Sequence, residues 1–144
     1  MTLREKCPVL EFKNLGDERG NLVAIEGGIT IPFDICRVFY IYGTDPNAVR
    51  GQHANKNSEF VLINVAGSSK VRIKDGVEEA VIELNKPLMG VYIPKMIWKD
   101  MYDFSKDSVL LVLTNTHYDE GEYIRDYYEY LESVRKNEEN FVYN

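Results

Sequence analysis

The chain has 144 residues, of which 44% are hydrophobic, and its formal net charge at pH 7 is -6. This length indicates one domain with a substantial core, and ten tyrosines and six phenylalanines exclude a disordered chain. No apolar run approaches the roughly 20 residues that a membrane-spanning helix needs. The negative net charge argues against a nucleic-acid-binding surface, although a few inward-facing cations can still hold a small anionic substrate.

The N-terminus and the cysteines bear on the compartment. The first ten residues mix charged with apolar side chains and do not have the pattern of a signal peptide. Cys7 and Cys36 form no recognisable disulfide or metal-binding spacing. We therefore expect a cytoplasmic protein with two reduced thiols.

Short segments rich in β-branched and aromatic residues follow one another along the chain. The expected strands are 23–25, 37–42, 59–66, 69–74, 80–84, 90–93 and 109–114. Turn signals separate them at 17–20, 27–28, 44–47, 66–68, 74–76 and 85–87. Strands at this spacing without helices between them predict an all-β fold, an antiparallel sandwich or barrel.

The apolar period changes after residue 119. Apolar and aromatic residues then recur every three or four positions, at Ile124, Tyr127, Tyr128, Leu131 and Val134. This spacing predicts a C-terminal helix that covers the end of the barrel, with a short charged tail from Lys136. We expect a single domain over 1–144, with its core at about 10–132.

The segment Arg50-Gly51-Gln52-His53-Ala54-Asn55 resembles the histidine cluster of metal-binding cupins with one ligand missing. Such cupins carry His-x-His, a glutamate four residues later and a third histidine on a later strand. Here an asparagine takes the second position, and Trp98-Lys99 stands where the third histidine is expected. A three-imidazole cage for Zn, Fe or Mn cannot be assembled, so we expect no metal.

Side-chain alternation decides which residues can share a cavity. If the segment is extended, His53 and Asn55 face the same way, and Glu59 joins them where the alternation is unbroken. On the next strand Lys70 and Arg72 share a face. Paired basic residues on adjacent strands can surround an anionic ligand, or they can form a solvated face.

Several stretches together carry a resemblance to a known family. They are 17–26, 31–33, 37–41, 50–54, 98–104 and 118–125, and they extend over about residues 12–131. In combination they resemble the cupin sugar 3,4-ketoisomerases, which act on dTDP-4-keto-6-deoxy-D-glucose in the biosynthesis of 3-amino-3,6-dideoxy sugars for surface polysaccharide. The resemblance implies a jelly-roll fold, a homodimer that exchanges N-terminal strands, no metal or cofactor, and a cavity for the thymidine diphosphate sugar.

The chain also departs from the family pattern. Members usually carry histidines where this chain has Asn55 and Lys99. His53 is then the only imidazole of the expected site, because His117 follows the last barrel strand. Either one histidine suffices, or the chemistry has changed while the ligand class has stayed.

One imidazole is chemically sufficient for the isomerisation. The reaction removes a proton from C3 and delivers one to C4 of the resulting enediol, and one base can do both on a single face. His53 is the expected base, and Tyr40 or Tyr42 can relay a proton between the two oxygens. Asn55 and Lys99 can donate hydrogen bonds to the enediolate.

The remaining candidates bind or orient the substrate. Glu59 either orients the imidazole or lies at the cavity edge, and Trp98 either stacks on the ligand or belongs to the core. The full set of expected substrate-binding residues is Arg19, Arg37, Arg50, Glu59, Lys70, Arg72, Trp98 and Lys99.

The turn that carries Arg19 bears on the product. In the resembling enzymes this neighbourhood affects whether the product has the galacto or gluco arrangement, and the Asp-x-Arg-Gly form here resembles the galacto type. Two other functions remain open. One is a non-catalytic cupin that binds a nucleotide sugar and acts with a transferase, and the other is a metal-dependent cupin.

Overall fold

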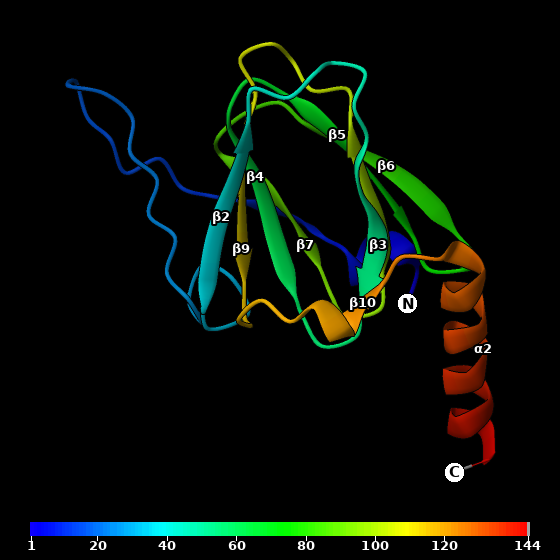
Figure 1. The fold of residues 1–144 in the computed structure, drawn as a ribbon. Helices are drawn as coiled ribbons and strands as arrows, with labels where there is room; N and C mark the ends of the chain where they lie inside the picture. The colour runs from blue at the N-terminus through cyan, green and yellow to red at the C-terminus, as the bar shows by residue number, and fades with distance from the viewer. Residues whose placement is uncertain (144) are drawn as a thin grey trace.

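Two five-stranded sheets face each other in the computed structural model, which describes residues 1–143 and the side chains of 1–138 (Figure 1). The order in the first sheet is β1 (Val9–Glu11), β7 (Met89–Ile93), β4 (Phe60–Ala66), β9 (Val109–Thr114) and β2 (Arg37–Tyr42). In the second it is β10 (Tyr123–Ile124), β3 (Arg50–Asn55), β8 (Trp98–Tyr102), β5 (Ser69–Lys74) and β6 (Glu79–Leu84). All the strand pairs are antiparallel, which confirms the all-β prediction.

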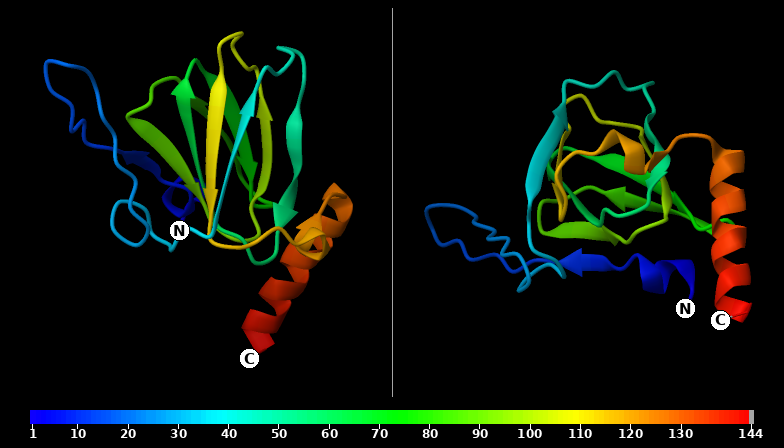
Figure 2. Two further views of the ribbon diagram at one scale, coloured as in Figure 1. Left: turned by 60° about the vertical axis from the view of Figure 1, so that its left-hand side comes forward. Right: turned by 60° about the horizontal axis from the view of Figure 1, so that its bottom comes forward.

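The core lies between the two sheets, which close around a common interior (Figure 2). Along β5, Ser69, Val71 and Ile73 are buried while the residues between them are partly exposed, as the strand period requires. The central strand β4 is buried from Phe60 to Asn64, because sheet neighbours flank it and residues 12–36 cover its outer face.

Residues 12–36 form a long excursion, part of which packs on the outer face of the first sheet while its tip projects away from the barrel (Figure 1). The turn expected at 17–20 is present, with a bridge between Asp17 and Gly20. The strand expected at 23–25 is wrong, since those residues pair with no strand. Val23 and Ile25 instead pack with Phe12 and Phe33 against the outer face of the first sheet.

Three helical segments complete the chain: α1 (Leu3–Lys6), the 3-10 turn η1 (Glu120–Glu122) and α2 (Tyr127–Tyr143). The predicted C-terminal helix is confirmed, but it lies beside the second sheet instead of covering the barrel end (Figure 1). It also runs through the segment from Lys136 that we expected to be a tail. Neither α-helix has the length and apolarity of a membrane span within the described residues.

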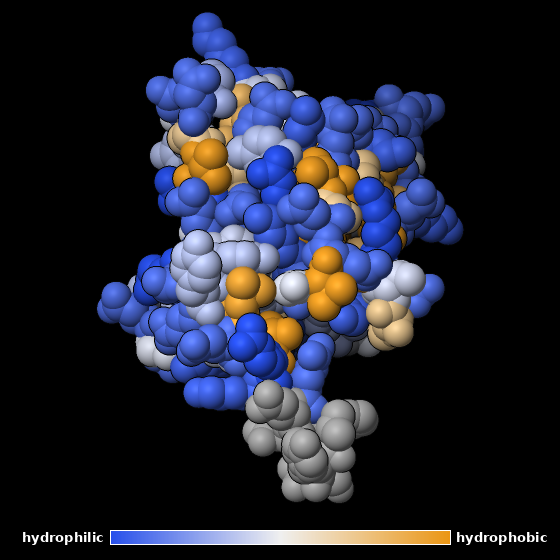
Figure 3. All heavy atoms as spheres, turned by 90° about the vertical axis from the view of Figure 1, so that its right-hand side faces the viewer, coloured by the Kyte–Doolittle hydropathy of each residue, from blue (hydrophilic) through white to orange (hydrophobic). Residues whose placement is uncertain are grey.

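The contact of α2 with the barrel centres on Tyr130, which is fully buried. Its hydroxyl donates to the carbonyl oxygens of Met96, at 2.8 Å, and Lys74, at 3.1 Å. Its ring lies 5.7 Å from that of Trp98. The face that carries this helix is mostly hydrophilic and shows only separate hydrophobic patches (Figure 3).

Replacing Tyr130 tests this anchor. Tyr130→Phe removes a buried donor from two carbonyl groups, and we expect a loss of about 1–3 kcal/mol in the free energy of unfolding. The measurement is urea unfolding followed by circular dichroism. Tyr128→Phe is the matched control, because Tyr128 is 81% exposed on the same helix and its substitution should leave the urea midpoint unchanged. Equal midpoints for the two variants would contradict the anchor.

Candidate functional site

A β-bulge in β3 places His53 inside the barrel. Arg50 pairs with Met101, Gly51 with Asp100 and His53 with Lys99, so Gln52 is an extra residue without a partner on β8. The bulge needs positive φ angles, 84° at Gly51 and 57° at Gln52. A Cβ atom at Gly51 would lie 2.9 Å from the carbonyl oxygen of Lys99, so only glycine fits there.

The bulge also changes which residues share a face. Arg50 and His53 are three residues apart, so in a regular strand they would point to opposite faces. Because Gln52 is extra, both line the same cavity. This cavity of about 140 Å³ lies between the two sheets. Its lining residues are Phe39, Ile41, Arg50, Gly51, His53, Phe60, Leu62, Lys99, Met101, Val112 and Tyr123.

His53 is held in an apolar environment. The ring of Tyr123 lies 4.7 Å from the imidazole, at an interplanar angle of 58°. Burial lowers the pKa of His53 to about 4, and the positive charge of Lys99 acts in the same direction. The imidazole is therefore neutral at pH 7 and able to accept a proton.

Lys99 lies opposite His53 on the neighbouring strand and is 3% exposed. Its Nζ donates to Oδ1 of Asn55 at 2.9 Å and lies 4.2 Å from the centre of the Phe60 ring. Among the described residues no carboxylate forms an ion pair with it. Burial lowers the pKa of Lys99 to about 7, so it exchanges its proton near neutral pH.

Asn55 contacts Lys99 from beside the cavity and is not one of the residues that line it. The residue is 1% exposed, and its Oδ1 is occupied by Lys99. Its Nδ2 is buried and has no hydrogen-bond partner among the described residues. A buried amide in this state has donors to offer to an acceptor that enters the site.

Arg37 lies at the start of β2, on the same face of the strand as the cavity residue Phe39. Its guanidinium carbon is 5.4 Å from the Phe39 ring and 5.5 Å from that of Tyr118, and Tyr118 in turn contacts Tyr123 at 5.8 Å. The Nε and Nη2 atoms of Arg37 are buried and lack partners within the described residues. A guanidinium with unused donors is suited to bind an anionic group.

The structure corrects the prediction that Tyr40 lies in the site. Arg37, Phe39 and Ile41 are the half-buried residues of β2, so the residues between them point outward. Tyr40 is 63% exposed and Tyr42 is 70% exposed, and their rings lie 6.0 Å apart on the outer face. Neither tyrosine can relay a proton in the cavity of its own barrel.

Lys70 and Arg72 also face outward, because Val71 and Ile73 occupy the inner face of β5. Lys70 pairs with Asp103 at 3.1 Å. The guanidinium of Arg72 lies 4.9 Å from the ring of Tyr102. The prediction that these two residues bind substrate inside the barrel is therefore wrong, and the solvated-face alternative applies.

Trp98 and Glu59 are held away from His53. Trp98 packs edge-on against Tyr127 of α2 at 5.1 Å and belongs to the helix-docking cluster. Glu59 accepts hydrogen bonds from the Tyr92 hydroxyl at 2.5 Å and from Nδ2 of Asn115 at 2.9 Å. Both of its carboxylate oxygens are thus used elsewhere, so it does not orient the imidazole.

Arg19 lies in the turn at the tip of the projecting excursion. Its side chain is 87% exposed and pairs with Asp17 of the same turn at 2.6 Å. The excursion points away from the barrel (Figure 1), so the structure does not bring Arg19 to the cavity of its own chain.

Tyr123 is the main site residue that side-chain alternation did not find. It lies on β10, which has two residues and offers no alternation to interpret. The only sequence signal was its place in the stretch 118–125, which matched the family. Phe60 and Met101 were missed for a simpler reason, since apolar residues on strands give no sign of facing a ligand cavity.

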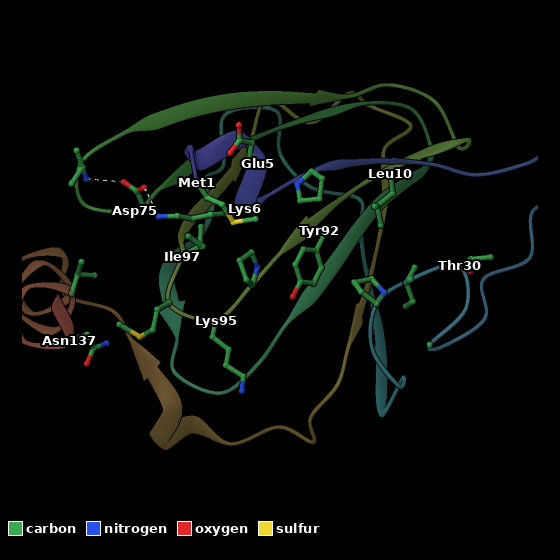
Figure 4. Close-up of a pocket in the computed structure, with 18 of the residues that line it drawn as sticks. Met1, Glu5, Lys6, Leu10, Thr30, Asp75, Tyr92, Lys95, Ile97 and Asn137 are labelled. Atoms are coloured by element: carbon green, nitrogen blue, oxygen red, sulfur yellow. Dashed lines mark hydrogen bonds and ion pairs between the residues drawn. The ribbon is translucent and has the colours of Figure 1, made fainter. Parts of the chain in front are cut away.

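A larger hollow of about 1230 Å³ lies elsewhere, between the N-terminal residues, the excursion and α2 (Figure 4). Tyr92, Lys95 and Ile97 line it, as does the ion pair of Lys6 and Asp75. It contains no histidine, so it offers no base comparable to His53. Within the described residues, no three His, Cys, Asp or Glu side chains gather as a metal site would require.

Comparisons with known proteins identify relatives of this chain. Residues 5–135 match the family model described as FdtA, WxcM-like, C-terminal. The chain is 43% identical over 128 residues to the TDP-4-oxo-6-deoxy-alpha-D-glucose-3,4-oxoisomerase of Aneurinibacillus thermoaerophilus, covering 89% of this chain and 92% of that one.

Solved structures extend the match to three dimensions. The sugar 3,4-ketoisomerase of Thermoanaerobacterium thermosaccharolyticum in complex with TDP has 45% identity and a TM-score of 0.89, over 92% of this chain and 96% of that one. The TDP-fucose-3,4-ketoisomerase of Campylobacter jejuni has 47% identity and a TM-score of 0.86, over 89% and 95%. The chain therefore belongs to the FdtA (WxcM-like) family, that of the cupin sugar 3,4-ketoisomerases it resembles in sequence.

Proposed function

We propose that this chain moves the keto group of TDP-4-keto-6-deoxyglucose from C4 to C3. The observation that carries the proposal is a neutral, half-buried His53 directly opposite Lys99 in the barrel cavity. The Aneurinibacillus relative bears the name of this activity, and the Thermoanaerobacterium enzyme was solved with TDP. The relatives supply the substrate class, and the cavity supplies groups suited to the reaction.

The residues act in a sequence that balances protons. His53 takes the proton from C3, and the negative charge develops on the C4 oxygen. The Lys99 ammonium and the Asn55 amide donate to that oxygen, in a site where low polarity strengthens both interactions. Lys99 gives the C4 oxygen a proton and takes one from the C3 hydroxyl, which is possible because its pKa is about 7. His53 then returns its proton to C4, which leaves the ketone at C3.

Substrate binding does not need the base. A His-to-Asn variant of the Thermoanaerobacterium enzyme was crystallised with TDP-4-keto-6-deoxyglucose. We infer the same separation of binding from turnover for His53. Arg50 lines the cavity, and Arg37, beside the cavity residue Phe39, has unused buried donors. We infer that these two guanidinium groups hold the anionic part of the ligand.

We also infer a galacto product, destined for a 3-amino-3,6-dideoxy sugar of surface polysaccharide. The inference rests on Arg19 in its Asp-x-Arg-Gly turn. Overall similarity does not decide it, because the TDP-fucose enzyme of Campylobacter jejuni is 47% identical to this chain and the TDP-quinovose enzyme of that bacterium is 44% identical.

Arg19 can act on the sugar only from a partner chain, because its own excursion points away from its own barrel. This favours the homodimer with exchanged N-terminal strands. The large hollow beside the N-terminal residues gives a second copy a place to pack (Figure 4).

The first test is proton NMR with TDP-4-keto-6-deoxyglucose in deuterated buffer. We expect a 3-keto product with deuterium at the reacting carbons and the galacto configuration at C4. His53→Asn should lower turnover by at least about a hundredfold, as removal of a general base does, and should leave the substrate dissociation constant within a few-fold. Tight binding with neither product nor exchange in the wild type would support the non-catalytic, nucleotide-sugar-binding alternative.

Lys99→Met tests the role of the buried ammonium. We expect kcat to fall about a hundredfold, the effect of removing one donor to a developing oxyanion. The same substitution should raise the free energy of unfolding at pH 7. The pKa of Lys99 is about 7 when folded and 10.5 as its ordinary value, so the unfolded chain binds more protons between these limits and wild-type stability rises with pH there.

The lysine therefore destabilises the fold most at pH 7 and below. The free energy of unfolding recovers by about 1.4 kcal/mol for each pH unit between the folded and the ordinary pKa. Urea midpoints should show Lys99→Met gaining stability over the wild type at pH 7, with the gain shrinking toward pH 10. Lys56→Met is the control, because Lys56 is exposed nearby. A difference that does not depend on pH would contradict the assignment.

Mixed dimers test the exchange. Arg19→Ala alone should lose the galacto product, and His53→Asn alone should not turn over. When the two variants are refolded together, a barrel that keeps His53 can receive Arg19 only from the other chain. We expect the galacto product to reappear, at about a quarter of the wild-type rate if chains pair at random. Its absence, with mixed dimers confirmed by mass, would place Arg19 at its own barrel or outside the site.

A further inference from the structure

The segment from Asp119 to Arg125 closes one side of the cavity. Its strand β10 pairs with the edge of β3, with Tyr123 opposite Asn55 and Ile124 opposite Ala54. Figure 1 shows it passing beneath the lower end of β3. Tyr123 is the residue of this segment that lines the cavity, and its ring lies on the imidazole of His53.

Glu122 ties this segment to the loop after β3. It is 2% exposed, and its Oε1 accepts from the backbone N–H groups of Asn57 and Ser58, both at 2.9 Å. Its Oε2 accepts from the hydroxyl of Ser58, and its carbonyl oxygen accepts from the N–H of Lys56 at 3.0 Å. Among the described residues no basic side chain forms an ion pair with it.

A buried carboxylate with only neutral donors needs those donors to stay in place, because each unmade bond costs its full desolvation. The carboxylate therefore fixes the distance between the 56–58 loop and η1. The next residue along the chain is Tyr123, whose ring centre lies 4.7 Å from the guanidinium carbon of Arg125 and 5.8 Å from the ring of Tyr118. The position of Tyr123 over the imidazole thus depends on Glu122.

We propose that Glu122 is a positioning residue for the base: by anchoring η1 and β10 to the loop after β3, it keeps Tyr123 over His53 and keeps water away from the imidazole. The link to catalysis rests on the proposed function, whereas the effect on His53 is measurable without turnover. Glu122 itself does not touch the reacting atoms.

Several charges face His53 from the elements around it. They are Lys99 on β8, Arg125 after β10, Glu122 in η1 and Arg50 on β3 itself. Burial is the largest influence on the pKa of His53 and lowers it, Lys99 and Arg125 lower it further, and the charge of Glu122 raises it. Glu122 therefore acts in two opposite ways, through its charge and through the burial that it maintains.

Two substitutions of Glu122 separate these effects, because both remove the same charge. In Glu122→Gln the amide oxygen still accepts from the two backbone N–H groups and the Ser58 hydroxyl can accept from the new amide nitrogen, so the anchor remains while the charge is lost. In Glu122→Ala the anchor is lost and the imidazole becomes hydrated. We expect the pKa of His53 to stay at or below its wild-type value in the first variant and to rise toward 6.5 in the second.

The measurement is a proton NMR titration of the imidazole signals. The chain has two histidines, so His53→Asn assigns the remaining signal to His117. Glu120→Ala, which removes an exposed carboxylate from the same turn, should leave the titration of His53 unchanged. If Glu122→Ala does not fold, Tyr123→Ala uncovers the imidazole without touching the anchor, and the pKa of His53 should again rise.

Kinetics provide a second readout. The acidic limb of kcat/KM should move to higher pH in Glu122→Ala and in Tyr123→Ala, and should not do so in Glu122→Gln. The proposal is overturned if the alanine and glutamine variants shift the pKa of His53 in the same direction, or if Tyr123→Ala leaves it unchanged. A protein with no turnover would refute the proposed function, yet the NMR titration would still decide the role of Glu122.

Discussion

The pairing of β3 with β8 is the constraint on which the site depends. The extra residue Gln52 turns Arg50 and His53 to one side and brings His53 opposite Lys99. The bulge is possible because residue 51 is a glycine. It adopts a positive φ angle, and it leaves room for the carbonyl oxygen of Lys99, with which a side chain would clash. Without it, the polar groups of β3 would be divided between the cavity and the outer face, and no single cavity would hold them all.

The same arrangement places two titratable groups, the imidazole of His53 and the amine of Lys99, largely away from the water that would stabilise their charged forms. Burial disfavours the charged form of both, which keeps His53 neutral and brings the pKa of Lys99 to about 7. An uncompensated lysine in a core destabilises the fold, and such residues persist where function needs them. The cavity therefore holds a neutral imidazole, which can accept a proton, and a lysine that can release one near pH 7, at the expense of stability.

The strands that could be predicted from the sequence are those in which apolar residues mark the extended backbone, either in a continuous run or at alternate positions. The strands at 37–42 and 69–74 were predicted residue for residue, since β-branched and aromatic residues mark the first and alternating β-branched residues the second. β3 and β8 were missed because polar residues that serve the cavity break the pattern. Alternation joined His53 with Asn55, of which only His53 lines the cavity. Alternation also cannot say which face is inside, so Tyr40 was chosen where Phe39 lines the cavity.

The remaining errors involve contacts between residues that are far apart in sequence. One such contact also joins the two positions at which this chain departs from the family pattern. Asn55 and Lys99 are 44 residues apart, yet Nζ of one donates to Oδ1 of the other. Two positions that carry histidines in the resembling enzymes are thus occupied by an amide and an ammonium that share one hydrogen bond. Alone, either group would leave a buried donor or acceptor unpaired. The two departures are therefore joined by a direct hydrogen bond, and of the chain's two histidines only His53 lines the cavity beside them.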